Sequence, residues 1–197
     1  MKLVVLGGSE LIGRKLISRL RHDGHDALAA APGAGLSDAL AGAQVVIDVT
    51  TPPFGDDALR NLLSAESAAG VAHHVAFFRA EVAQEEVVKA GPVPYTIVRA
   101  TLLFEDIAGI VEPSGDRDTD RRSRVLVQPV AAADVAGALA DVAAGTPLDD
   151  TIELAGPEAF ALDARSLGAA PDGDSLIPGD GARIAPTHFE DWLSQSN

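Results

Sequence analysis

Short apolar runs alternate along the chain with stretches whose apolar residues recur at every third or fourth position. The continuous runs predict strands that are covered on both faces, and the other stretches predict helices with one apolar side. Predicted strands cover residues 3–6, 26–31, 43–50, 73–78 and 94–101, and predicted helices cover 11–20, 37–41, 56–69 and 79–90. This alternation predicts an α/β fold, a three-layer, doubly wound parallel sheet of the Rossmann-like type with right-handed crossovers.

The last third of the chain is less regular. Residues 112–124 are rich in charge, proline and glycine, which predicts a solvated connection; a mobile flap over the sheet edge is the alternative. Further predicted elements are a strand at 125–130, a helix at 131–144, a strand at 151–155, a loop at 172–185 and a short final helix with Phe189, Trp192 and Leu193. We expect a single Rossmann-like domain over 1–197. Its core would cover about 1–111, and a small irregular C-terminal portion of about 112–197 would complete a crevice.

Charge and composition narrow the range of partners. The 29 acidic and 15 basic residues give a formal charge of −14, which disfavours nucleic acid and anionic membrane surfaces as partners. The chain has no cysteine, which excludes disulfides, thiolate metal sites and a cysteine nucleophile. The first apolar run is too short for a signal peptide, and no run reaches the ~18–20 residues of a membrane helix. We therefore expect a cytoplasmic protein with a small-molecule ligand, and a homo-oligomer stays open.

The first predicted strand leads through glycines into the first predicted helix, where Rossmann folds hold a pyrophosphate. This turn, Gly7–Gly13, reads G-G-S-E-L-I-G and resembles the G-x-x-G-x-x-G turn of the atypical short-chain dehydrogenase/reductase family, in its NmrA-like, NAD(P)H-binding branch. Other similar stretches are Gly70–Val75, Phe78–Ala80 with Gln84 and Glu85, Pro94–Arg99, Val127–Val130 with Asp134–Ala136, and Ala155–Glu158. The resemblance implies that any cofactor would be bound by Gly7, Gly8, Ser9, Gly13 and Thr50.

Two departures from the family pattern affect that cofactor. Glu10 stands where the middle glycine would let the backbone approach the pyrophosphate, and it adds an anion there. Two negative charges ~4 Å apart repel by about 4 kcal/mol at an effective dielectric constant of about 20. Residues 29–33 offer neither an acid for a ribose hydroxyl nor a base for a 2′-phosphate. We therefore expect no cofactor or weakly bound NAD(P)H; the alternative is that Glu10 is an ordinary acid at a helix start.

The expected reaction centre also departs from the family. Reductases of the family place a tyrosine and a lysine in a Y-x-x-x-K arrangement, and Phe77 and Glu81 stand at these positions. Neither residue can perform the original proton transfer and ribose binding. Glu10 and Glu81 are instead candidate catalytic carboxylates for general acid/base work, with two solvated helix acids as the alternative. The expected substrate crevice is lined by Thr51, Pro52, Phe77, Phe78, Thr101 and Phe104.

Three functions stay open. The first is a divergent protein that has lost redox chemistry and binds or transforms a small apolar molecule without nicotinamide, by isomerisation, cyclisation or dehydration. The second is an NAD(P)H-dependent reductase of the NmrA-like group, and the third is a non-catalytic regulator or subunit partner. No metal site is predicted, because His73 and His74 lack further ligands at a recognisable spacing. Arg99, at the end of a buried strand, is predicted to pair with an acid.

Overall fold

Seven parallel strands of the described residues form one sheet. Their order across the sheet is β2 (Asp26–Ala30), β1 (Lys2–Leu6), β3 (Val45–Asp48), β4 (His73–Phe78), β5 (Tyr95–Ala100), β7 (Asp150–Ala155) and β9 (Arg183–Ile184). Every neighbouring pair is parallel. The computed structural model describes residues 1–31, 33, 35–51, 54–79, 82–108, 124–163 and 176–196.

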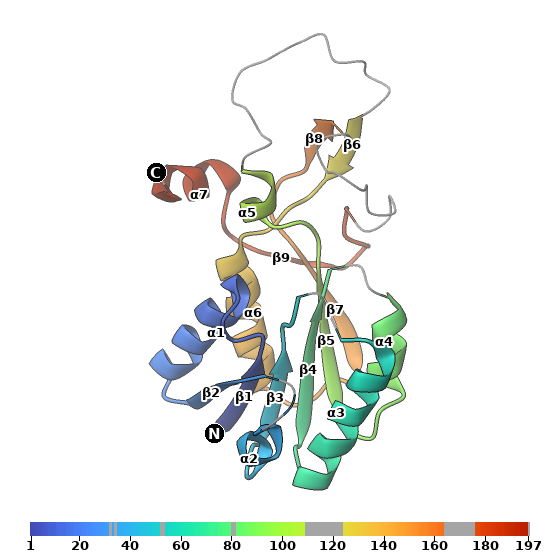
Figure 1. Ribbon diagram of the computed structural model, residues 1–197. Helices are drawn as coiled ribbons and strands as arrows, with labels where there is room; N and C mark the ends of the chain where they lie inside the picture. The colour runs from blue at the N-terminus through green and yellow to red at the C-terminus, as the bar shows by residue number, and fades with distance from the viewer. Residues whose placement is uncertain are drawn as a thin grey trace.

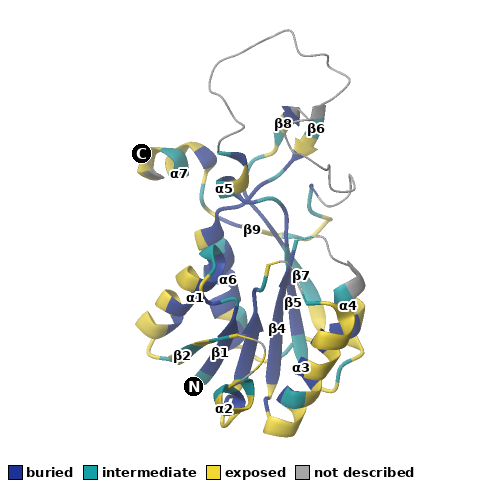
Figure 2. Cartoon of the chain, viewed as in Figure 1, coloured by how far each residue is buried: buried dark blue, intermediate teal, exposed yellow. Residues whose placement is uncertain are grey.

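Helices cover both faces of this sheet. Helices α1 (Leu11–His22) and α6 (Ala132–Ala144) pack together on one face, and α2 (Leu36–Leu40), α3 (Asp56–Ala69) and α4 (Val82–Lys89) lie on the other (Figure 1). Side chains alternate between the faces along each strand. Leu3 and Val5 of β1 therefore belong to the apolar cluster beneath α1 and α6, whereas Val4 and Leu6 belong to the cluster beneath α2, α3 and α4. Figure 2 shows the central strands almost wholly buried between these layers.

The sheet is short on its β2 side. The dinucleotide-binding order 3-2-1-4-5-6 has two strands beyond the first strand on that side. Here β2 is the edge strand, and the chain returns through α2 to place β3 on the other side of β1. The strand order therefore reverses between β1 and β3. Such a switch point, at the carboxyl ends of the strands, is where open α/β sheets bind their ligands.

A smaller group of elements lies beyond the carboxyl ends of the strands (Figure 1). It contains α5 (Phe104–Ile107), α7 (Phe189–Ser196) and the antiparallel pair β6 (Arg124–Val127) and β8 (Phe160–Asp163). An aromatic cluster holds it together, because the Phe104 ring lies 5.1 Å from Phe189 and 5.8 Å from Trp192 between ring centroids. This third apolar cluster is separate from the two that cover the sheet.

The predicted three-layer, doubly wound parallel sheet is confirmed, and the predicted elements between residues 3 and 78 agree with the observed ones to within two residues. Two expectations were wrong, and one strand was missed. The strand predicted at 125–130 ends at Val127, because Pro129 cannot donate a ladder hydrogen bond. The predicted loop at 172–185 contains β9, and β8 was not predicted. Residues 112–123, within the predicted solvated connection or mobile flap, lie outside the described residues. No described helix has the length and apolarity to span a membrane.

Candidate functional site at the switch point

The turn after β1 depends on its glycines for packing within the chain. Gly7 has φ of +75°, and a Cβ atom on it would lie 2.8 Å from the carbonyl oxygen of Val49. A Cβ on Gly8 would lie 2.8 Å from the Cβ of Ala29, and one on Gly13 would collide with the carbonyl oxygen of Gly7. Only glycine fits these positions without a shift of the backbone. The turn thus keeps a Rossmann-like path for reasons that do not require a ligand.

Glu10 links the two loops that form the switch point. Its backbone is extended at the start of α1, and its side chain does not cap that helix. Instead its Oε1 accepts a hydrogen bond of 3.3 Å from the backbone N–H of Thr51, in the loop after β3. Ser9 beside it is exposed, and its carbonyl oxygen accepts a hydrogen bond from the guanidinium of Arg14. A carboxylate therefore lies between the carboxyl ends of β1 and β3.

Asp48 is a buried acid at this site that the sequence analysis missed. The hydroxyl of Thr50 donates to Asp48 Oδ1 over 2.6 Å, and the backbone N–H of Thr50 donates to the same oxygen over 3.0 Å. Burial raises the pKa of the Asp48 carboxyl, although the hydrogen bonds from Thr50 act in the opposite direction. The available signal was an aspartate inside an otherwise apolar run, between Ile47 and Val49. The hydroxyl of Thr50, a predicted cofactor residue, is engaged within the chain.

The structure places the other predicted crevice residues in well-packed surroundings. Phe77 and Phe78 are 6% and 4% exposed and point to opposite faces of the sheet. Thr101 is buried and its hydroxyl donates to the carbonyl oxygen of Gln128. Phe104 belongs to the aromatic cluster with α7. Pro52 and Glu81 lie outside the described residues, so the predicted pairing of Glu10 with Glu81 stays a prediction.

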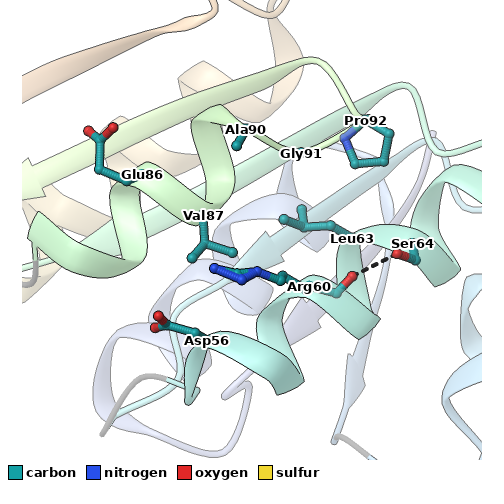
Figure 3. A pocket seen from close by; sticks show the side chains of 9 residues that line it. All are labelled: Asp56, Arg60, Leu63, Ser64, Glu86, Val87, Ala90, Gly91 and Pro92. Atoms are coloured by element: carbon teal, nitrogen blue, oxygen red, sulfur yellow. Dashed lines mark hydrogen bonds between the residues drawn. The ribbon is translucent and has the colours of Figure 1, made fainter.

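A pocket of about 240 Å³ opens beside the switch point, on the face covered by α2 and α3. It is lined by Leu6, Gly33, Leu36, Phe54, Ala58, Asn61 and Leu62. Aliphatic and aromatic side chains dominate the lining, and Asn61 adds one amide. A second hollow, of about 470 Å³, lies between α3 and α4 (Figure 3). Its lining includes Arg60, Glu86 and Pro92, and it extends away from the switch point to the loop before β5.

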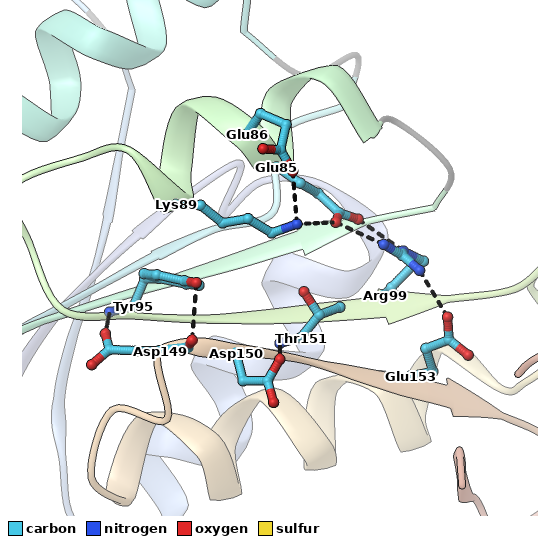
Figure 4. Close-up of polar contacts among 9 residues, drawn as sticks. All are labelled: Glu85, Glu86, Lys89, Tyr95, Arg99, Asp149, Asp150, Thr151 and Glu153. Atoms are coloured by element: carbon cyan, nitrogen blue, oxygen red, sulfur yellow. Dashed lines mark hydrogen bonds and ion pairs between the residues drawn. The ribbon is translucent and has the colours of Figure 1, made fainter. Parts of the chain in front are cut away.

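Charged side chains meet near the carboxyl ends of β5 and β7 (Figure 4). Arg99 donates two hydrogen bonds, of 2.8 and 2.7 Å, to the fully buried carboxylate of Glu85, and a third of 2.7 Å to Glu153. Glu153 in turn accepts a 2.6 Å hydrogen bond from the backbone N–H of Gly179. The predicted pairing of Arg99 with an acid is confirmed. Among the described residues, no group of three or more His, Asp or Glu side chains is placed to hold a metal ion.

Comparisons with known proteins support the fold and leave the function open. No family model matches the chain, and no curated protein matches it by sequence. Among solved structures, a short-chain dehydrogenase/reductase superfamily protein from Agrobacterium tumefaciens with bound NAD is 16% identical, with a TM-score of 0.65 over 98% of this chain and 95% of that one. MoeE5 in complex with UDP-glucuronic acid and NAD is 16% identical, with a TM-score of 0.71 over 98% and 97%. The NADPH-dependent quinone oxidoreductase QOR2 of Escherichia coli, with NADPH, is 18% identical, with a TM-score of 0.65 over 80% and 70%. The chain thus shares its α/β Rossmann-like fold with these structures.

Proposed function

We propose that this chain binds a small, largely apolar molecule at the switch point and needs no nicotinamide to do so. The observation that carries the proposal is the hydrogen bond of 3.3 Å from the Thr51 N–H to the Glu10 carboxylate. In this fold the turn after β1 and the start of the next helix receive the phosphates of a dinucleotide. Here a carboxylate of the chain itself lies at that turn and is held by a main-chain amide. This arrangement does not fit a pyrophosphate, because the negative charges of the pyrophosphate would lie next to the negative charge of Glu10.

The pocket beside the switch point supports an apolar ligand. Leu6, Phe54 and Leu62 give it an apolar wall, and the Asn61 amide can donate and accept hydrogen bonds that orient a bound molecule. Its volume of about 240 Å³ lies below the range of roughly 300–1,000 Å³ that is typical of pockets for drug-sized ligands. The preferred ligand is therefore a compact molecule with one polar group.

If the bound molecule is converted, Glu10 and Glu81 are the residues proposed to move the proton. One carboxyl would donate a proton while the other accepts one, which suits isomerisation, cyclisation or dehydration without a redox step. Glu81→Gln keeps the shape of the side chain and removes its titratable carboxyl group. It should cost at least about 100-fold in rate, the usual lower scale for the loss of a general acid or base. Full activity in Glu81→Gln would assign the chemistry to other residues.

Titration with NADH and NADPH tests the proposal directly. The protein should bind both weakly, and Glu10→Gly should bind at least about ten-fold more tightly because it removes a like charge and opens the turn. Glu10→Gln, which removes only the charge, should fall between them. Glu190→Gln removes an exposed acid from α7 and is the matched control. Micromolar binding by the unmodified protein that neither Glu10 variant changes would overturn the proposal.

A second experiment tests the apolar pocket with indole as the probe. Ala58 lies on the exposed side of α3 and lines the pocket, so Ala58→Phe should fill it without disturbing the core. Indole added to the unmodified protein should shift the amide NMR signals of Leu6 and Asn61, and Ala58→Phe should abolish these shifts. Ala68→Phe, on the same helix but outside the lining, should leave them unchanged. Equal shifts in both variants would show that indole binds elsewhere.

One observation favours a second candidate, an NAD(P)H-dependent reductase. The glycine turn keeps the backbone path of the fold, and similar structures carry bound NAD or NADPH. A reductase would oxidise NADPH in step with the substrate it consumes, whereas the proposed protein would turn over without added nicotinamide. The same titration separates the two, because a reductase must bind the dinucleotide before it reacts.

A further inference from the structure

A groove of about 440 Å³ runs between α1 and the edge strand β2, away from the pocket at the switch point. Its lining residues are Gly8, Arg14, Ile17, Ser18, Arg21 and Ala29. Two arginines and a serine thus face a hollow whose remaining lining is apolar or glycine. We propose that this groove binds a small organic phosphate.

The groove is open because β2 is the edge strand of the sheet in the described part of the chain. In the longer strand order, a crossover from β2 to a further strand would place a helix beside α1 on this face. Here the chain leaves β2 for α2, which packs on the opposite face. The β2 side chains that face α1 are Ala27, which is buried, and Ala29, which is exposed. Small side chains at an uncovered edge leave the space that the groove occupies.

The two arginines differ from three others in the described chain, which are ion-paired. Arg19 pairs with Asp23, Arg79 with Asp106, and Arg99 with Glu85. In the described part of the chain, Arg14 and Arg21 make no ion pair, although the chain has 29 acidic and only 15 basic residues. They are held by main-chain carbonyls instead. Arg14 donates from Nη1 to Ser9, and Arg21 donates from Nε and Nη2 to Ala27 over 3.0 and 2.9 Å.

These anchors fix the guanidinium groups and leave further N–H groups for a ligand. Arg14 uses Nη1 for its hydrogen bond to the main-chain carbonyl oxygen, and its Nε and Nη2 have no acceptor among the described residues. Arg21 uses Nε and Nη2, and its Nη1 has no acceptor there either. A guanidinium presents its N–H groups as a planar fork that matches the oxygens of a phosphate. A pre-positioned fork loses less entropy on binding than one that is free in solvent.

The spacing of Arg14, Ser18 and Arg21 along α1 indicates the size of the ligand. Positions 14, 18 and 21 share one helical face, and the Cα atoms of the two arginines are about 10 Å apart along the axis. A phosphate at one guanidinium therefore leaves room for an organic body over Ile17 and Ala29, with the Ser18 hydroxyl alongside. The net charge of −14 repels anions at long range. Binding of an anion must therefore come from contacts within the groove, which favours a fitted ligand over a loose counter-ion.

Calorimetric titration with phenyl phosphate tests the proposal. Arg14→Gln and Arg21→Gln should each weaken binding by at least about ten-fold, because each removes charge-assisted hydrogen bonds. Lys15→Gln removes one positive charge from the same helix outside the groove lining, and should change the affinity by less than about two-fold. Arg21→Lys keeps the charge but loses the fork, so it should bind more weakly than the unmodified protein and more tightly than Arg21→Gln.

Several outcomes would overturn the groove assignment. One is the absence of phenyl phosphate binding at millimolar concentration, and another is an equal loss in Lys15→Gln and Arg14→Gln. Phenol that binds as tightly as phenyl phosphate would show that the phosphate is not recognised. Binding of NADPH but not of phenyl phosphate would assign the arginines to a dinucleotide. The groove and the switch-point pocket share no residue, so failure of one proposal leaves the other standing. Melting temperatures identify any arginine variant that fails to fold. In that case Ser18→Ala, which also changes the groove lining, is titrated in its place.

Discussion

His73 and His74 are buried neighbours on β4, yet their pKa values are shifted in opposite directions. His73 faces the α6 side, where its Nε2 is hydrogen-bonded to the Thr96 hydroxyl at 2.9 Å. Burial and the charge of His74 lower the pKa of His73 to about 4. His74 faces α3, and its Nδ1 donates to both carboxylate oxygens of Glu66, at 2.9 and 3.0 Å. Burial alone would lower the pKa of His74, but the charge and hydrogen bonds of Glu66 outweigh it and raise that pKa.

This contrast extends to the two faces of the sheet. The apolar cluster beneath α1 and α6 is almost wholly aliphatic, and the buried polar side chains on that face include the hydrogen-bonded pair of His73 and Thr96. The face beneath α3 and α4 buries Glu66 with His74, Glu85 with Arg99, and Asp48 with Thr50. A buried charge is tolerated only when it is paired and hydrogen-bonded. The α3 and α4 face therefore depends on specific partners, whereas the α1 and α6 face depends on volume and shape.

Removal of Glu66 should give the largest effect. Glu66 and His74 have fully buried side chains, so Glu66→Ala leaves the imidazole without its acceptor and opens a cavity. Breaking a buried ion pair from one side costs about 3–5 kcal/mol of the free energy of unfolding. Urea unfolding at pH 6 measures this loss. Glu86→Ala, which removes an exposed acid from α4, should cost less than about 1 kcal/mol. Equal losses in both variants would mean that the buried pair contributes no more than a surface pair.

The second prediction concerns pH and His73. Its folded pKa of about 4 lies below the value of about 6.5 in an unfolded chain. Between these values the unfolded state binds a proton that the folded state does not, so the free energy of unfolding falls as the pH falls. The full effect is about 3 kcal/mol. His73→Gln keeps a polar partner for Thr96 and does not titrate, so its stability should vary less between pH 6.5 and 4. Parallel pH curves for both proteins would contradict the assignment.

The third prediction reverses the sign for His74. Its folded pKa is raised, so its contribution to stability is complete below about pH 6.5 and is lost as the pH rises through the folded pKa. In the Glu66→Ala variant this loss on the alkaline side should disappear, because the acceptor that raised the pKa is gone. Urea unfolding of both proteins from pH 6 to 9 measures the difference. A difference that grows with pH would contradict this sign.

The burial of these charged and polar residues could be predicted from the sequence. Residues 59, 62 and 63 mark the buried stripe of α3, and the same helical spacing places Glu66 on that stripe. Strand alternation likewise places His73 and His74 on opposite faces of a strand buried on both sides. Each residue was therefore readable as buried, but the pairing of Glu66 with His74 was not, because it depends on how α3 packs across the sheet. The contact between Glu10 and Thr51 was hidden for the same reason.

The fold could be predicted from the sequence more completely than the site, because helices and strands follow from local sequence patterns. Most strands of the central sheet are short apolar runs with glycine or proline nearby, and these signals suffice to place those strands along the chain. The two-residue strand β9 is too short to show any alternation, and its place beside β7 comes from tertiary packing. The groove at Arg14 and Arg21 was missed for another reason. Among the described residues no strand follows β2 at this edge and no helix covers it beside α1, and such an uncovered edge cannot be predicted from local sequence patterns.

A smaller effect is expected for Thr96→Val on the His73 side. The Thr96 hydroxyl is hydrogen-bonded to His73 and accepts the backbone N–H of Leu148 over 3.1 Å. Loss of a neutral hydrogen bond costs about 1 kcal/mol, and the buried ring of His73 then lacks a partner at Nε2. The free energy of unfolding should therefore fall by roughly 1–3 kcal/mol. Thr151→Val, on the neighbouring strand β7, is the control for the loss of a hydroxyl. If the two variants are equally stable, the Thr96 hydrogen bonds add nothing measurable.

The smallest expected effect is that of Glu153→Ala, at the exposed end of the charged face. Arg99 would keep both hydrogen bonds to Glu85, and the side chain of Glu153 is 30% exposed, so solvent screens its contribution. The global free energy of unfolding should fall by no more than about 1 kcal/mol. The local effect should be larger, because the Gly179 N–H loses its acceptor and with it the hydrogen bond between this segment and the Glu153 side chain of β7. Hydrogen exchange at Gly179 should therefore speed up at least about ten-fold while exchange within β5 stays unchanged, since one lost charge-assisted hydrogen bond is worth about 1.5–3 kcal/mol. Equal acceleration in β5 would show that Glu153 stabilises the sheet as a whole and that the charged face extends to its edge.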